Sequence, residues 1–239
     1  MKRQADKKRN ILVVDIGASH VKCAATNHQP SVRFSSGKKM GPERMMKQLL
    51  KVTDGWGFDA VSIGFPGVVH HRRIACEPHN MASGWIGFDF HKAFGVPVRI
   101  INDAAMQALG GYDGGKMLFL GLGTGLGSAL IVEGVIAAME LSHLHYGSGR
   151  TYEDCVGEKA REQLGNKKWR HNVDKVVDGF RKALLPDYIV LGGGNVVHLK
   201  QLPPSTRRGD NAEAIVGGFR LWESHHSEPC PATRSWPTR

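Results

Sequence analysis

Cysteine is scarce in this sequence of 239 residues and is not arranged for metal binding. The four cysteines lie far apart and form no C-x-x-C pair, which argues against a cysteine zinc cluster and against a disulfide framework. Such usage is typical of a reducing compartment, so we expect a cytoplasmic protein. The four positions are Cys23, Cys76, Cys155 and Cys230.

Long hydrophobic runs are also lacking. The basic segment MKRQADKKRN precedes an apolar run, Ile11 to Val14, that stops at Asp15 and is too short for a signal peptide. No segment approaches the length that a membrane span requires, so no membrane partner is expected. No internal repeat of solenoid length is present either.

Acidic residues are outnumbered by basic ones. Lys and Arg total 32 and Asp and Glu total 22, which gives a formal net charge of +10 and a pI of about 9.6. This balance suits a polyanionic partner such as nucleic acid, anionic lipid or a polyphosphorylated substrate. The charge is scattered along the chain, however, so a basic protein without a polyanionic partner is an equal alternative.

Two familiar nucleotide-binding signatures are absent. The pattern G-x-G-x-x-G fails from each glycine where it could start. The segment GGYDGGK at 110–116 is close to a P-loop, but Met117 stands where a magnesium-binding Ser or Thr is needed. That segment also leads into a predicted strand instead of following one, which indicates a surface loop.

Instead of these signatures, the sequence contains a glycine-rich stretch predicted to form a hairpin, MLFLGLGTGLGSALIV at 117–132. Valine, leucine and isoleucine supply two strands, and the glycines between them allow an anion to approach the backbone N–H groups. We interpret the hairpin as a phosphate-binding turn. A tight turn in which glycine only relieves crowding is the alternative.

The remaining chain alternates strands with helices, which predicts an α/β fold. A helix over 42–52 should bury Met45, Met46, Leu49 and Leu50 on one face. Further strands are expected at 11–15, 60–65, 97–101 and 188–191, further helices at 104–109, 169–185 and 210–222, and a disordered tail from Glu223.

Polar residues where elements end are candidates for chemistry. Asp15 ends a strand before a glycine turn, where a carboxylate is well placed to hold Mg²⁺ near phosphate oxygens. Asp103 follows another strand at the start of a helix, either as its N-cap or as a functional carboxylate. Glu140 and His143 form an E-x-x-H pair that suits a metal or a surface pair. The triple glycine at 192–194 suits contact with a nucleobase or ribose, or is a flexible turn.

The order of these motifs carries more information than any one of them. Along the chain come DIGASHVK, GFPG, NDAA, GLGTGLG, E-x-x-H and LGGG, followed by a helix of small residues. In this order they resemble the ROK family of sugar kinases and related repressors over 11–222, most of all its short glucokinases and polyphosphate glucokinases. The resemblance implies an actin-like ATPase fold (hexokinase-like, ribonuclease H-like) of two α/β lobes with a central cleft. The smaller lobe would span 11–103, joined by the helix 210–222, and the larger lobe 104–209, with the disordered tail at 223–239.

The resemblance also implies roles for single residues. Asp103 matches the catalytic base that accepts the proton of the sugar hydroxyl, and Asp15 would hold Mg²⁺ through water. Trp85 would cover an apolar sugar face or simply pack in the core. Sugar contacts are implied for Asn80, Asn102, Glu140, His143 and Glu153. Phosphate or nucleotide contacts are implied for Asp15, Gly17, Ser19, Lys22, Gly123, Thr124, Gly125, Gly192, Gly193 and Gly194.

Three departures from the family pattern bear on these roles. The clustered C-x-C-G-x-x-G-C that binds structural zinc together with the equivalent of His143 is missing, so we predict no structural zinc. Ser142 replaces the glycine of the usual E-x-G-H and could shift Glu140. The usual threonine of the first phosphate motif is replaced within Gly17-Ala18-Ser19, although Ser19 keeps a hydroxyl.

The resemblance therefore predicts a phosphotransferase with an alcohol group as acceptor. It would transfer a phosphoryl group to the 6-hydroxyl of glucose with Mg²⁺, from ATP, polyphosphate or both, and the basic charge slightly favours polyphosphate. The alternative is a ROK-type sugar sensor or transcriptional regulator without kinase activity. Because ten residues precede the first predicted strand, where such regulators carry a winged helix-turn-helix, we expect no DNA partner. A homodimer is implied by the resemblance alone.

Overall fold

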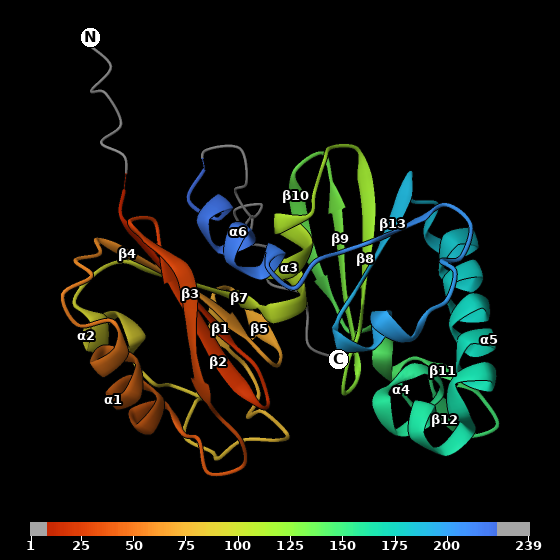
Figure 1. Cartoon of the computed structure of the whole chain (residues 1–239), viewed down its shortest axis with the longest axis horizontal. Coiled ribbons are helices and arrows are strands. Elements are labelled where there is room, and N and C mark those ends of the chain that lie inside the picture. Colours follow the sequence, from red (N-terminus) through yellow and green to blue (C-terminus); the bar gives the residue numbers. More distant parts are fainter. Residues whose placement is uncertain (1–8, 224–239) are drawn as a thin grey trace, which may run out of the picture.

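The computed structural model describes residues 9–223, and the predicted disorder of the tail at 224–239 concerns residues outside this range. Two five-stranded sheets dominate the described chain (Figure 1). No helix in 9–223 is long and apolar enough to cross a membrane.

The first sheet has the strand order β3-β2-β1-β4-β7. Strands β1, β2 and β3 form an antiparallel meander, whereas β4 and β7 run parallel to β1. The strands are β1 (Ile11–Ile16), β2 (His20–Ala25), β3 (His28–Ser35), β4 (Ala60–Phe65) and β7 (Val98–Asn102). Every residue of β4, the strand between β1 and β7, is buried, as expected for a strand covered on both faces.

The second sheet repeats this arrangement with the order β10-β9-β8-β13-β14. Its antiparallel part contains the predicted glycine hairpin, and its parallel part follows the long helix. The strands are β8 (Lys116–Leu122), β9 (Leu126–Val132), β10 (Val135–Met139), β13 (Tyr188–Gly192) and β14 (Thr206–Arg208). Two further hairpins are small: β5 (Val69–His70) with β6 (Arg73–Ile74), and β11 (His145–Gly147) with β12 (Arg150–Thr151).

Helices cover the outer faces of both sheets (Figure 1). Helix α1 (Pro42–Val52) packs Met45, Met46 and Leu49 against the first sheet, near the short α2 (Phe90–Phe94). Leu50 was predicted on the same buried face but is 46% exposed. Consecutive residues of a helix point in different directions, so the side chain after the buried Leu49 faces away from the sheet. The long α5 (Glu158–Leu184) follows α4 (Glu153–Val156), covers the second sheet and is interrupted at Gly165.

Helices α3 (Asp103–Gly110) and α6 (Glu213–Arg220) pack together between the two sheets (Figure 1). They approach so closely that a Cβ at Gly217 would overlap the carbonyl oxygen of Met106. On the first sheet, Ser62 Oγ in β4 donates to the Gly218 carbonyl at 2.6 Å. Helix α6 therefore joins the core of a sheet whose first strand lies about 200 residues earlier in the sequence.

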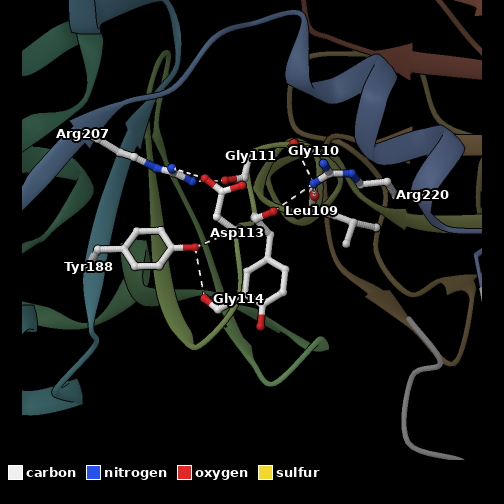
Figure 2. Close-up of polar contacts among 9 residues, drawn as sticks. Leu109, Gly110, Gly111, Asp113, Gly114, Tyr188, Arg207 and Arg220 are labelled. Carbon is white, nitrogen blue, oxygen red and sulfur yellow. Dashed lines mark hydrogen bonds and ion pairs between the residues drawn. The ribbon is translucent and has the colours of Figure 1, made fainter. Parts of the chain in front are cut away.

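The C-terminal end of α3 is fixed by arginine side chains (Figure 2). Arg220 donates to the carbonyl oxygens of Leu109, Gly110 and Tyr112, each at 3.0 Å. These carbonyls lie where a helix end leaves acceptors unsatisfied, so a cation at this position stabilises the end of α3. Arg207 of β14 forms an ion pair with Asp113, in the loop that follows α3, at 2.5 Å.

Candidate active site

A cavity of about 1410 Å³ is lined by residues of both sheets and of α3. Its lining includes all of the predicted site residues except Ser19 and Gly192. These residues are far apart in the sequence, so the fold gathers them into one site. The individual roles assigned to them stay predictions, and the geometry of each follows.

Asp103 is the first residue of α3 and faces this cavity. The N-cap is the preceding Asn102, whose Oδ1 accepts from the N–H of Ala105 at 3.1 Å, so the N-cap interpretation of Asp103 is wrong. Asp103 Oδ1 instead accepts from the N–H of Ala104 at 2.8 Å, which holds the carboxylate at the helix N-terminus. Asn102 also donates to the Gly67 carbonyl at 3.1 Å, so both polar groups of its side chain have partners within the protein.

The carboxylate of Asp103 is held in surroundings that disfavour its charge. Burial and the neighbouring negative charge of Asp15 raise the pKa of Asp103 from 3.8 to about 7, and Glu140 adds to this. The hydrogen bond from Ala104 works in the opposite direction. A carboxyl group with a pKa near neutrality is suited to accept a proton at physiological pH.

The turn between β1 and β2 forms one wall of the cavity. In this wall Asp15 lies beside Lys22, with 3.7 Å between Oδ2 and Nζ. Burial raises the pKa of Asp15, and the positive charge of Lys22 opposes this increase. The N–H of Gly17 donates to the His20 carbonyl at 2.9 Å, which closes the turn. The exposed Ser19 is not part of the lining, and its carbonyl accepts from the N–H of Ser36.

The turn between β8 and β9 faces the same cavity with Gly123, Thr124 and Gly125. The N–H of Gly123 donates to the Gly125 carbonyl at 3.1 Å. A Cβ at Gly125 would overlap the carboxylate of Glu153, which also accepts from the N–H of Leu126 at 3.4 Å. Glycine is therefore required here by the close approach of a side chain from α4.

The triple glycine after β13 divides into two roles. Gly193 and Gly194 line the cavity, whereas Gly192 is not part of the lining and packs against the ring of Phe119. Gly193 has φ 83° and ψ 163°, a conformation that is open essentially to glycine alone. Asn195 links this turn to the β8–β9 turn, because its Nδ2 donates to the Gly123 carbonyl at 3.0 Å.

Asn80 lies in the segment 77–86, which is held in place by Glu77. The carboxylate of Glu77 accepts from the N–H groups of Gly84, Trp85 and Ile86 at 3.1, 3.1 and 3.2 Å. These hydrogen bonds hold the pKa of Glu77 below its ordinary value although partial desolvation opposes them. Neither Glu77 nor Asn195 was singled out from the sequence, because a side chain that binds distant backbone groups leaves no local pattern.

Trp85 is fully buried beside Phe65 and does not line the cavity, so its core interpretation is the one that the structure supports. Glu140 and His143 do line the cavity, 3.8 Å apart between Oε2 and Nε2. Ser142 contributes a weak hydrogen bond at 3.5 Å to Glu140, a contact that the glycine of the family pattern would lack. Among the described residues no three His, Cys, Asp or Glu side chains gather as a metal site, and the absence of zinc stays a prediction.

Comparison with known proteins supports the family resemblance. Polyphosphate glucokinase of Mycobacterium tuberculosis (strain CDC 1551 / Oshkosh) is 26% identical over 211 residues, which cover 80% of this chain and 79% of the relative. Polyphosphate glucokinase of Mycobacterium leprae (strain TN) is 26% identical over 203 residues, 76% of this chain and 62% of that relative.

A solved structure shares the fold. The inorganic polyphosphate/ATP-glucomannokinase from Arthrobacter sp. strain KM superposes with a TM-score of 0.75 at 22% identity, over 88% of this chain and 97% of that one. Together with the two-sheet arrangement this confirms the predicted actin-like α/β fold with a central cleft. The model of the ROK family matches residues 11–140, more than half of the sequence and both of the glycine turns at β1–β2 and β8–β9. The chain therefore belongs to the ROK family.

Proposed function

We propose that this ROK-family phosphotransferase is a sugar kinase that transfers a phosphoryl group from ATP or inorganic polyphosphate to the 6-hydroxyl of glucose. The observation that carries the proposal is the position of Asp103, a carboxyl group with a pKa of about 7, in the cavity that both glycine turns line. The relatives named polyphosphate glucokinase support polyphosphate as the donor and glucose as the acceptor, and the name of the Arthrobacter kinase adds ATP as a donor.

The donor phosphates would lie between the turn at Gly17 and the turn at Gly123–Gly125. Residues of both turns line the cavity, and Lys22 adds a positive charge. When ATP is the donor, its nucleoside would lie against Gly193 and Gly194.

Magnesium fits the chemistry of this end of the cavity. Asp15 is buried and close to Asp103, so the state in which both carboxylates are ionised is unfavourable. A divalent cation between them and the donor would reduce this repulsion. Asp15 would hold the ion through water. When bound, the ion would neutralise charge on the donor phosphates.

The acceptor sugar would lie beside Asp103, with its hydroxyls toward Asn80, Asn102, Glu140, His143 and Glu153, the last of which stands against the turn at Gly125. Asp103 would accept the proton of the attacking hydroxyl while that oxygen bonds to the terminal phosphorus of the donor. The bond from phosphorus to the bridging oxygen breaks, and the shortened donor leaves with the electron pair. Orientation by the helix N-terminus keeps the carboxylate aimed at the acceptor.

We further propose that the lobes expected from the sequence, 11–103 with 210–222 and 104–209, close over the substrates by a motion about α3. The regulator alternative is not favoured, since a sensor has no need of a base and two phosphate turns in one cavity.

A phosphoryl-transfer panel tests the proposal. Glucose, mannose, fructose and N-acetylglucosamine are crossed with ATP and polyphosphate, with and without Mg²⁺, beside the Asp103→Asn variant. Mg²⁺-dependent transfer to glucose that is lost in the variant is the expected result. Binding of a sugar without transfer from either donor would overturn the kinase assignment in favour of a sensor.

A further inference from the structure

A second hollow lies outside the catalytic cavity, between the end of β3 and the start of α1. It has a volume of about 500 Å³, and we name it the β3–α1 pocket. Its polar lining consists of Ser35, Ser36, Lys38, Lys39, Arg44 and Gln48.

The β3–α1 pocket is strongly basic. Three cationic side chains line it and no carboxylate does. Over the surrounding residues 28–53 the sequence has six Lys or Arg and one acidic residue, Glu43, which lies outside the lining. Among the ion pairs of residues 9–223, none involves Lys38, Lys39 or Arg44. The positive charge of the pocket is therefore not neutralised within the described chain.

The pocket is joined to the donor end of the catalytic cavity. Ser36, in the pocket wall, donates from Oγ to the Gly17 carbonyl at 2.6 Å and from its N–H to the Ser19 carbonyl at 2.9 Å. Gly17 belongs to the cavity lining, so a residue of the pocket wall is hydrogen-bonded directly to the β1–β2 turn that borders the cavity.

Basic residues also lead from the catalytic cavity to the edge of the first sheet, where the pocket lies. The strand register pairs Asp15 with Lys22 and Lys22 with Arg33, so these side chains lie in one row on one face of the sheet. The next row on that face pairs His20 with Ser35, which lines the pocket. Lys22 lines the catalytic cavity, and the exposed Arg33 lies next to it on β3, the edge strand that also contributes Ser35 to the pocket. Because α1 packs on the opposite face of this sheet, a chain from the cavity would reach the pocket around the β3 edge.

We propose that the β3–α1 pocket binds the distal part of an inorganic polyphosphate chain whose terminal phosphate is in the catalytic cavity. This inference rests on the proposed function and extends its donor site. ATP ends in a nucleoside that would lie against Gly193 and Gly194 after β13, whereas a long polyphosphate has only further charged phosphates to place. Several weak contacts to one linear anion add to a large effective affinity, because each holds the next phosphate close to its site.

The test compares two triple variants that remove the same charge. The pocket variant is Lys38→Gln/Lys39→Gln/Arg44→Gln. The control replaces three exposed lysines that do not line the pocket, Lys47→Gln/Lys51→Gln/Lys92→Gln. All six positions are exposed, so both variants should fold, which circular dichroism verifies.

Two readouts separate this inference from the proposed function. The first is the KM for long-chain polyphosphate, for tripolyphosphate and for ATP. The second is the Kd of fluorescently labelled long-chain polyphosphate, measured by anisotropy at low and high salt without sugar or turnover. In the pocket variant we expect the KM and Kd for the long chain to rise about tenfold, with a smaller dependence on salt, since each exposed contact is weak. Values for tripolyphosphate and ATP should stay within about twofold.

Each alternative result has a definite meaning. An unchanged Kd for the long chain, an equal loss in the control variant, or an equal rise in the KM for ATP would overturn the pocket assignment. Wild-type protein that transfers from no donor would refute the proposed function. In that case a pocket-dependent Kd would still establish a polyphosphate site, and an unchanged one would refute both.

Discussion

Asp103→Asn is the substitution that most directly tests how the cavity works, because it changes the charge of the side chain and little else. The asparagine oxygen can still accept from the N–H of Ala104, so the start of α3 should keep its geometry. The lost property is the ability to take a proton. We expect kcat to fall by about 10²- to 10⁴-fold, equivalent to about 3–5 kcal/mol in the barrier, while sugar binding is largely retained.

The same substitution should make the protein more stable at neutral and higher pH. Because folding raises the pKa of Asp103 from 3.8 to about 7, ionisation of this group opposes folding. The opposing contribution is absent below about pH 4 and grows as the pH rises to 7. Three pKa units correspond to about 4 kcal/mol, but part of the side chain is reached by water in the cavity, which lowers the expected gain to about 1–2 kcal/mol.

Urea unfolding at pH 5 and pH 8 measures this gain, with Asp54→Asn as a matched control at an exposed carboxylate that follows α1 and does not line the cavity. Asp103→Asn should gain stability over the wild type mainly at pH 8, and the control should not. Wild-type turnover in Asp103→Asn would refute its role as the base. Equal stability of wild type and variant at both pH values would refute the unfavourable burial of its charge.

Three further substitutions address other parts of the site. His143→Ala should raise the sugar KM several-fold with little change in kcat, and loss of bound zinc from this variant, measured by metal analysis, would contradict the prediction of no zinc. Gly193→Ala should lower the free energy of unfolding by about 2 kcal/mol or more, because the new Cβ would overlap the Leu122 carbonyl at a φ of 83°. Gly194→Ala meets no atom within 4 Å and is its control, so equal unfolding curves would count against the strain argument. Glu77→Gln should weaken the hydrogen bonds that hold the segment carrying Asn80, so it should raise the sugar KM and leave the ATP KM unchanged. Equal effects on both constants would point to a general loss of structure.

Local sequence patterns predicted the helices and strands in which apolar residues are regularly spaced or continuous. Helix α1 spans its predicted range, from Pro42 at its first turn to Val52, with its methionines and Leu49 on the buried face. Strand β4 also matches its predicted range. Strands β2 and β3 were not predicted. Strand β3 is exposed along most of its length, and the only alternation of apolar and polar residues in it is the short stretch around Val32 and Phe34. It is a strand because it pairs with β2.

The candidate site was predictable from the order of motifs and not from any of them alone. Asp15 and Asp103 come together because β1 and β7 are parallel strands with β4 between them, and their carboxyl ends meet at one edge of the sheet. The family pattern placed Ser19 in the phosphate site, but the turn leaves it exposed and outside the lining. Hydrogen bonds such as that from Asn195 to Gly123 join residues 72 positions apart and have no signature within either segment.

The packing of α6 has a consequence for the order in which the chain is made. One face of the first sheet is covered by α3 and α6, and the small residues of α6 admit Val13 of β1 directly against the Gly218 backbone. During synthesis at about 5–20 residues per second, β1 therefore waits roughly 10–40 seconds for the helix that completes its cover. Until then the apolar face of β1 stays exposed to solvent and to other proteins. A chain truncated before residue 213, where α6 begins, should therefore bind chaperones or aggregate.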